Sequence, residues 1–336
     1  TRLVRLLRAE GFMSVDAGTG SLLSALADAG VFRLGGTIVG THAFRLYEGE
    51  LGLRYGLTQA AQTNDIDIAQ FERLSLALDD QVETSLPDTF RTLDFRPLPS
   101  TDGPATWRWQ QTRSDTLIEF LTPSFRAEED IRTLPALGVS AQSLHFLNYL
   151  IADPIPATVL YRSGVLVQIP RPERFAVHKL IVADRRRTGP DALKSVKDRA
   201  QAAFLIETLA EDRPDELREA YEDALARGPK WTGRITASLA RMPETKARLA
   251  DLENRDQTSW ARVNLPNCSD GTPFVTRTIG PGNNKRHSML KSIIVPVLLS
   301  LGLTAAAQAQ EGRFRYHDET RGGPLVLLPS TEDPGE

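Results

Sequence analysis

The segment Asn64-Asp65-Ile66-Asp67-Ile68 constrains the fold more than any other part of this 336-residue sequence. Acidic residues and isoleucines alternate in it, which is typical of a β-strand with one polar and one apolar face. Successive side chains of a strand point to opposite faces, so Asp65 and Asp67 share a face. Two carboxylates this close repel each other, and a divalent cation between them relieves the repulsion. The segment therefore predicts a strand that presents a metal-binding carboxylate pair.

A glycine-rich turn precedes this segment. Gly35-Gly36-Thr37 follows an apolar run at residues 31–34, which we interpret as a short strand, and precedes a helical pattern over residues 37–46. Glycine lets a backbone approach a phosphate closely, and a helix N-terminus favours an anion. We therefore expect Gly35, Gly36 and Thr37 to bind the phosphates of a nucleotide.

A third acid lies in the strand-like run at residues 117–121, at Glu119. Magnesium prefers oxygen ligands and keeps several waters, so a few carboxylates are enough to hold it. Two magnesium ions can clamp the attacking oxygen and the leaving pyrophosphate of a phosphoryl-type transfer. We therefore predict that Asp65, Asp67 and Glu119 bind two Mg²⁺ ions and that a nucleoside triphosphate is the substrate.

Composition excludes several other classes of protein. A hydrophobic fraction of 41% and a charged fraction of 25% fit an ordinary soluble globular protein. The net charge of −3 gives no overall attraction to nucleic acid, so RNA binding would need a local basic face. The single cysteine, Cys268, excludes a disulfide framework within the chain and a thiolate zinc cage.

The pattern of elements changes after Pro170. Before it we expect short strands and helices: a helix over residues 21–29 with Ser21 as its N-cap, and two hairpins, at residues 106–110 with 117–121 and at 157–161 with 165–169. After it, helical spacing covers residues 174–187, 194–209, 215–226 and 234–252, with a break near Pro243. The predicted fold is α/β or α+β, a mixed sheet with helices in a catalytic domain over residues 1–170, followed by a helical domain over residues 171–254.

The end of the chain has a different character. We expect residues 255–288, which are polar and patternless, to form a disordered linker. Residues 289–309 combine a basic start, an apolar core and an A-x-A site, as a secretory signal peptide does. Our preferred interpretation is that residues 289–336 are a joined foreign reading frame, and the alternative is a single membrane anchor. For residues 1–254 we expect a cytoplasmic location and no stable membrane association.

Several cations and aromatic residues allow two interpretations. Lys179 is either a triphosphate-binding cation or a surface lysine on its helix. A group of basic residues is either a solvated helix end or an RNA-binding face; it comprises Arg185, Arg186, Arg187, Lys194, Lys197 and Arg199. Trp107 and Trp109 share a strand face, where packing is favoured over base stacking.

Three segments resemble the polymerase-β-like, or minimal, nucleotidyltransferase superfamily: residues 32–37, 63–69 and 119–123. More narrowly, they look like a bacterial branch of stand-alone nucleotidyltransferase-fold proteins with toxin-like relatives. The helical block at residues 171–180 and 197–202 resembles the second domain of that branch. The resemblance implies a nucleotidyltransferase-type fold and transfer of a nucleoside monophosphate from a triphosphate such as ATP to an acceptor hydroxyl. The acceptor could be RNA, protein or a small molecule.

Two further functions stay open at this level. The resemblance extends to toxins of toxin–antitoxin systems, which would imply an antitoxin protein and tRNA or another RNA as partners. The alternative to an enzyme is a catalytically inactive nucleotide-binding module of the same fold. That alternative is motivated by Glu119, where the superfamily more often has aspartate, and by the long step from Gly36 to Asp65.

Overall fold

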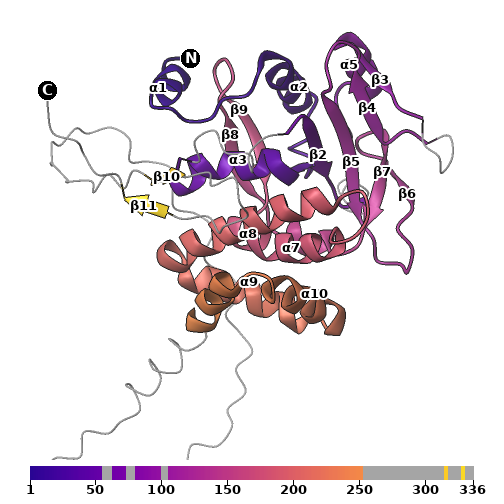
Figure 1. Cartoon of the computed structure of the whole chain (residues 1–336). Helices are drawn as coiled ribbons and strands as arrows, with labels where there is room; N and C mark the ends of the chain where they lie inside the picture. The colour runs from indigo at the N-terminus through magenta and orange to yellow at the C-terminus, as the bar shows by residue number, and fades with distance from the viewer. Residues whose placement is uncertain (55–62, 73–79, 100–104, 253–313, 317–326, 330–336) are drawn as a thin grey trace, which may run out of the picture.

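The computed structural model, which describes residues 1–54, 63–72, 80–99, 105–252, 314–316 and 327–329, contains a mixed sheet of seven strands (Figure 1). Its main path runs β1-β2-β5-β4-β3, and β7 joins the far end of β5 and pairs with β6. The β2–β5 and β5–β7 pairs are parallel and the others antiparallel. The strands are β1 (Thr37–Val39), β2 (Asp65–Ala69), β3 (Phe95–Pro97), β4 (Arg108–Gln111), β5 (Leu117–Pro123), β6 (Ile131–Leu134) and β7 (Val139–Leu144).

Two further pairs of strands lie outside this sheet. Strands β8 (Ile155–Val159) and β9 (Val165–Ile169) form an antiparallel hairpin, and β10 (Phe314–Tyr316) pairs with β11 (Leu327–Pro329). The hairpin lies against the start of the sheet, where Gln168 Nε2 donates to the Phe32 carbonyl at 2.8 Å. Both predicted hairpins, β4–β5 and β8–β9, are confirmed.

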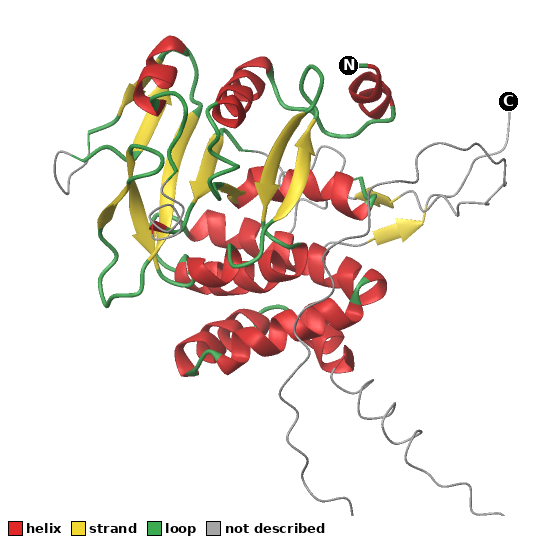
Figure 2. Ribbon diagram, turned by 180° about the vertical axis from the view of Figure 1, so that it is seen from behind, coloured by secondary structure: helices red, strands yellow, loops and turns green. Residues whose placement is uncertain are grey.

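Helices lie on both sides of the sheet and dominate after β9 (Figure 2). They are α1 (Arg2–Ala9), α2 (Ala17–Asp28), α3 (Gly40–Leu51), α5 (Leu86–Thr92), α6 (Leu147–Leu150), α7 (Pro172–Arg185), α8 (Ala192–Asp212), α9 (Pro214–Ala226) and α10 (Pro229–Leu239). The helical run breaks after α10 and resumes over residues 243–252, as Pro243 predicts. Among the described helices, none is long and apolar enough to span a bilayer.

The alternation in β2 and β5 produces the apolar face of the sheet. Ile66, Ile68, Ile118 and Phe120 are all fully buried on it. Helix α5 covers this face, because the Phe90 ring packs 6.0 Å from the Phe120 ring. Burial of these large side chains fixes the register, since a one-residue slip would turn them to the opposite face.

The helical part shares its core with the sheet part. Phe44 of α3 stacks on Phe175 of α7 with their centroids 6.3 Å apart, and Tyr47 meets the same ring edge-on at 5.3 Å. The Tyr47 hydroxyl donates to the Pro170 carbonyl at 2.9 Å, at the predicted domain boundary. The predicted architecture, a mixed sheet followed by a helical region, is confirmed, with one continuous hydrophobic core joining the two.

The predicted start of the helix over residues 21–29 is wrong. Helix α2 begins at Ala17, four residues before Ser21, and its N-cap is Asp16. The Asp16 carboxylate accepts from the Thr19 backbone N–H at 2.9 Å, which satisfies one of the unpaired donors of the first turn. The Ser21 hydroxyl instead meets the Tyr161 hydroxyl at 2.8 Å.

The predicted strand at residues 31–34 is also wrong, because this segment is a turn. Local hydrogen bonds close it: Leu34 N–H donates to the Gly30 carbonyl at 3.0 Å and Gly36 N–H to the Val31 carbonyl at 2.9 Å. The strand follows the glycine pair as β1, and the predicted helix begins at Gly40. The predicted linker, Cys268 and, apart from β10 and β11, residues 289–336 lie outside the described residues.

Candidate active site

The three predicted acids share one face of the sheet. Strands β2 and β5 run parallel, and their register places Asp67 directly opposite Glu119 and Asp65 opposite Leu117. Asp65, Asp67 and Glu119 are each partly exposed, whereas the alternating residues between them are buried. The structure therefore brings together acids that are more than fifty residues apart in the chain, as the sequence predicts.

The close approach of these carboxylates changes their acidity. Burial and then the Asp67 charge raise the pKa of Glu119 to about 7, against the Arg108 charge, which lowers it. Burial and the Asp65 charge likewise raise the pKa of Asp67. The Glu119 carboxyl donates a hydrogen bond to the Asp67 carboxylate, which requires one proton between the two groups. A cation bound here would replace that proton.

A glycine that sequence reasoning missed lies against the acids. Val39, at the end of β1, pairs with Asp67, and Gly40 then opens α3 with φ of +65°. A Cβ at Gly40 would overlap Asp67 Oδ2, so no larger residue fits this turn without displacing the carboxylate. Thr41 follows Gly40 in the first turn of α3. A strand-to-helix turn with free backbone N–H groups beside the carboxylates is a place where an anion can bind.

The predicted phosphate turn lies at the other end of β1. Thr37 pairs with Ala69, two residues along β2 from Asp67, and Gly35 and Gly36 precede it. Gly36 is needed for packing, because a Cβ there would lie 2.6 Å from Val31 Cγ1. The phosphate-binding role of Gly35, Gly36 and Thr37 stays a prediction, but the helix N-terminus on which it depended is at Gly40. In the sequence, the strand-like run at residues 37–39 directly before Gly40 was the signal that could have located this helix start.

Helices α7 and α8 bring cations to the carboxylates. Lys179 Nζ donates to Asp198 Oδ1 at 2.6 Å, and Arg186 donates to Asp198 Oδ2 at 2.9 Å. The charges of the buried Lys179 and the half-buried Arg186 both act to lower the pKa of Asp67, so this trio lies close to the acids. Lys179, predicted to bind nucleotide, is therefore at the site, and it is held there by Asp198.

A second cation from α8 lies in the same area. Burial and then the Lys179 charge lower the pKa of Lys197, while the charges of Asp65, Asp67 and Asp198 oppose that shift. Lys197 thus lies in the field of both the carboxylates and the Lys179 ion pair. Its place adds positive charge over the acid face, where a triphosphate would need it.

Strand β4 borders the acids on the side away from β1. Arg108 is the cross-strand partner of Glu119, and its guanidinium carbon lies 4.4 Å from the centre of the Trp107 ring. Trp109 points to the opposite face, where its ring packs 4.9 Å from Phe90 and 5.6 Å from Phe120. The packing interpretation of Trp109 is therefore confirmed.

The predicted basic face is largely neutralised by acids. Arg185 pairs with Glu129 at 2.7 Å, Arg186 with Asp198 at 2.9 Å, Arg187 with Asp184 at 3.5 Å and Lys194 with Asp191 at 3.3 Å. The remaining arginine of the group, Arg199, donates to the Ser195 hydroxyl at 3.0 Å. The charge run thus includes a set of ion pairs that tie α7 and α8 to neighbouring elements.

The carboxylates fit a magnesium ion by their chemistry. All are oxygen donors, and they carry the like charges that such a cation would stabilise. In the part of the chain that the structure describes, no three His, Cys, Asp or Glu side chains converge as a ready-made metal site. Asp65, Asp67 and Glu119 are the residues that would hold the ion, which would supply positive charge in place of the proton between Asp67 and Glu119.

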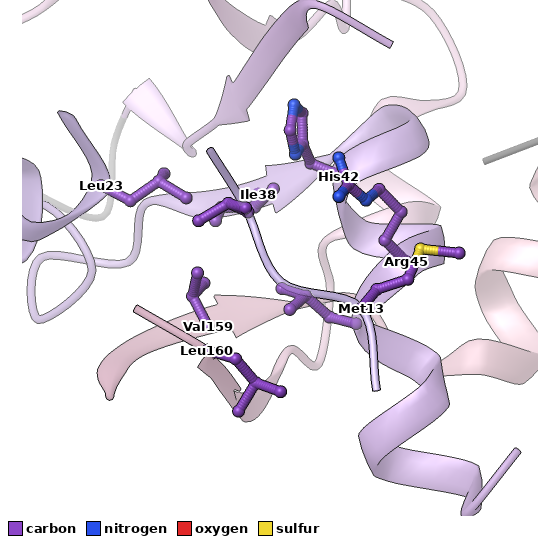
Figure 3. Close-up of a pocket in the computed structure, with 9 residues that line it drawn as sticks. Met13, Leu23, Ile38, His42, Arg45, Val159 and Leu160 are labelled. Atoms are coloured by element: carbon purple, nitrogen blue, oxygen red, sulfur yellow. The ribbon is translucent and has the colours of Figure 1, made fainter. Parts of the chain in front are cut away.

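A small pocket elsewhere is lined by none of these acids (Figure 3). Its walls are mostly apolar side chains, including Leu23, Ile38 and Val159, and it also contacts His42 and Arg45 of α3. Burial and the Arg45 charge lower the pKa of His42 to about 3, so the imidazole is neutral. The pocket lies on the apolar side of β1, because Ile38 pairs with Ile68.

Comparison with known proteins identifies the family of this chain. No curated protein matches the chain in sequence. One similar solved structure is that of an antigenic nucleotidyltransferase-like protein from Paracoccidioides brasiliensis, with 14% identity and a TM-score of 0.33 over 67% of this chain and 95% of that chain. A nucleotidyltransferase family model matches residues 17–226. The match covers more than half of the sequence, so the chain belongs to this family of nucleotidyltransferase enzymes.

Proposed function

We propose that this enzyme transfers a nucleoside monophosphate from a nucleoside triphosphate to an acceptor hydroxyl in a metal-dependent reaction. The observation that carries the proposal is the register of β2 and β5, which places Asp67 opposite Glu119 with Asp65 on the same face. Such a reaction needs oxygen donors for metal ions and a site for phosphates. Three carboxyl groups on one face, beside a helix N-terminus, match that need.

The donor triphosphate would bind on the β1 side of the acids. Gly40 and Thr41 offer backbone N–H groups at the start of α3, and Lys197 adds a positive charge from α8. Lys179 acts with Lys197 while Asp198 holds its ammonium group in place. Positioning of the phosphates by these groups accounts for much of the catalysis in this class of reaction.

Asp65, Asp67 and Glu119 would hold magnesium, which supplies charge neutralisation to the triphosphate and the departing pyrophosphate when bound. The carboxylate pair of Asp67 and Glu119 accepts the proton of the acceptor hydroxyl. The hydroxyl oxygen then forms a bond to the α-phosphorus, and the bond from that phosphorus to the β-phosphate oxygen breaks. Pyrophosphate leaves with the electron pair of that bond.

The test is incorporation of label from α-labelled nucleoside triphosphates into total cell extract, with magnesium or with a chelator. The Asp65→Asn, Asp67→Asn double variant should abolish labelling, because neither amide can replace a charged metal ligand. The matched control is Asp115→Asn, an exposed aspartate in the turn before β5, which should label as the unmodified protein does.

Undiminished labelling in the double variant would refute the mechanism. Binding of triphosphates by the unmodified protein without labelling of any component would favour the inactive nucleotide-binding module instead. Titration calorimetry with each triphosphate distinguishes that outcome from a failure to bind. Labelling that persists with the chelator would show that transfer needs no metal.

A further inference from the structure

Strands β4 and β3 extend the acid face toward the free edge of the sheet (Figure 1). Arg108 is opposite Glu119, Gln110 lies two residues further along β4 on the same face, and Arg96 of β3 is opposite Gln110. We call Arg96, Arg108 and Gln110 the arginine strip. It begins directly beside the third carboxylate and leads away from β1 and α3.

The other face of these two strands is occupied by the core. Phe95 and Trp109 point there, and the Phe90 ring of α5 packs 6.2 Å from Phe95 and 4.9 Å from Trp109. The strip thus faces away from α5, with Arg96 exposed and Arg108 half-buried. Because the packing of Phe95 and Trp109 fixes the register, it also fixes the direction in which the two arginines point.

The arginines of the strip differ from the cations on α7 and α8 in their ion pairing. Arg186 shares the buried Asp198 with Lys179, and Arg185 is bound to Glu129. Within the described part of the chain, neither Arg96 nor Arg108 has an ion-pair partner; Arg96 donates to the Thr112 hydroxyl at 3.1 Å, and Arg108 lies against Trp107. The Arg96 charge is therefore available to an external anion, and the Arg108 charge, which also acts on Glu119, is not bound in an ion pair.

We propose that the arginine strip binds phosphates of the acceptor, so that the acceptor is the hydroxyl end of a nucleic-acid strand. The inference rests on the function proposed above. Arginine recognises phosphate through two parallel N–H donors, and two arginines on neighbouring strands can contact more than one phosphate. Trp107 holds the Arg108 guanidinium in place by stacking. Arg108 would contact the phosphate nearest the attacking hydroxyl.

The position of the strip assigns it to the acceptor and not to the triphosphate. Gly40 and the start of α3 lie beside Asp67 on the β1 side. Arg108 lies on the opposite side, separated from β2 by β5. The attacking hydroxyl and the leaving pyrophosphate must lie on opposite sides of the α-phosphorus, since the attacking and leaving oxygens are roughly in line. A cation beyond Glu119 is therefore on the side of the attacking oxygen.

The test measures binding of a fluorescein-labelled single-stranded RNA and of a DNA of the same sequence, each with a free terminal hydroxyl, by anisotropy at fixed salt. The full chain is compared with Arg108→Gln, Arg96→Gln and the control Arg91→Gln. Arg91 lies on α5, on the far side of the same strands, and carries the same charge. Binding of ATP to each protein is measured by calorimetry in parallel.

Arg108→Gln should weaken strand binding by about tenfold or more, Arg96→Gln by less, and Arg91→Gln not at all. The slope of the logarithm of the binding constant against the logarithm of the salt concentration should become shallower by about one in the Arg108 variant. ATP binding should be unchanged. Equal loss for RNA and DNA identifies the phosphates as the group that is read, and loss for RNA alone identifies RNA as the acceptor.

The inference is overturned if the unmodified protein binds neither strand, if Arg91→Gln weakens binding as much as Arg108→Gln, or if Arg108→Gln weakens ATP binding instead. It is also overturned if label is transferred equally well to adenosine, which offers a hydroxyl and no phosphate. The Asp65→Asn, Asp67→Asn variant keeps the two hypotheses apart. It should bind the strand normally, and if it still transfers label the proposed mechanism fails whatever the strip does.

Discussion

The two faces of strands β2 and β5 have opposite roles although their residues alternate along the same chain. On one face Ile66, Ile68 and Phe120 are fully buried in the core. On the other face Asp67 and Glu119, the direct neighbours of these residues, are partly exposed and hydrogen-bonded to each other. Stability is thus concentrated on the face that α5 covers, and chemistry on the face where the charges of Lys179 and Lys197 act on the acids.

The difference shows why the acids can be held so close. Like charges at this distance repel, and the repulsion is tolerated because the apolar side of the same strands fixes the backbone. Removing a side chain from the apolar face should therefore cost mainly stability, whereas neutralising an acid should cost activity and relieve repulsion. Variants of adjacent residues test this separation most directly.

Phe120→Ala should have the largest effect. Its ring is fully buried and packs 5.6 Å from Trp109 and 6.0 Å from Phe90, so its loss leaves a cavity in the core. We expect a fall in the free energy of unfolding of about 3–5 kcal/mol, measured by urea denaturation. A loss under about 1 kcal/mol would contradict the assignment of this face to stability.

Glu119→Gln, one residue away, should act in the opposite direction on stability. Burial and the Asp67 charge raise the pKa of Glu119 from 4.5 to about 7, so the folded protein holds this proton more tightly than the unfolded chain does. Without metal, stability therefore falls as the pH rises from about 4.5 to about 7. The neutral variant avoids this loss and should be about 3 kcal/mol more stable than the unmodified protein at pH 8.

The same Glu119→Gln protein should lose nucleotidyl transfer. At pH 5 its stability should differ little from that of the unmodified protein, in which Glu119 already holds its proton. A loss of stability at pH 8, or a gain of the same size at both pH values, would mean that Glu119 does not share a crowded face with Asp67.

Much of this two-faced arrangement could be predicted from the sequence. The period-two alternation around Asp65 and Asp67 is a local pattern, and it fixes both the strand and the face of each side chain. The hairpin turn before β5 and the proline-punctuated helices after Pro170 are local signals as well. Glu119 was found because it is the one acid of a second strand-like run, and because residues 119–123 resemble the corresponding segment of the nucleotidyltransferase superfamily.

The parts that sequence reasoning missed depend on contacts between distant segments. Gly35-Gly36 is the more conspicuous glycine turn, and Gly36 packs against Val31, but the glycine that lies against Asp67 is Gly40. The basic run at Arg185 predicts a cationic face only while its partners are unknown; Glu129, 56 residues earlier, neutralises it. No local pattern reports such pairings, because they follow from how helices pack on the sheet.

Gly40→Ala sharpens the comparison on the acid face. The substitution forces a side chain into a backbone with φ of +65° and into Asp67 Oδ2, so we expect transfer activity to be lost with about 1–2 kcal/mol of stability. The control is Gly52→Ala at the other end of α3, where φ is +66° but nothing lies within 4 Å of an added Cβ. It should lose similar stability and keep its activity. Equal activity in the two variants would place the acids away from this turn.

A buried histidine beside the apolar pocket should have the smallest effect. His42 is buried against Arg45 beside the pocket that Ile38 lines, and its Nε2 has no hydrogen-bond partner among the described residues. Burial and the Arg45 charge lower its pKa to about 3, whereas an unfolded histidine titrates near 6.5. The unfolded chain therefore binds the proton first, and stability is lost as the pH falls below about 6.5.

His42→Gln removes this titration without adding a charge. Relative to the unmodified protein, the variant should gain about 1.4 kcal/mol of stability on moving from pH 8 to pH 5.5. The measurement is urea denaturation of both proteins at both pH values, so that any packing change caused by glutamine cancels in the difference. The shift should leave transfer activity at pH 8 intact, because His42 lines a pocket to which none of the three acids contributes. A stability difference that is independent of pH would mean that the imidazole is not held neutral, and that the apolar face is open to water at this point.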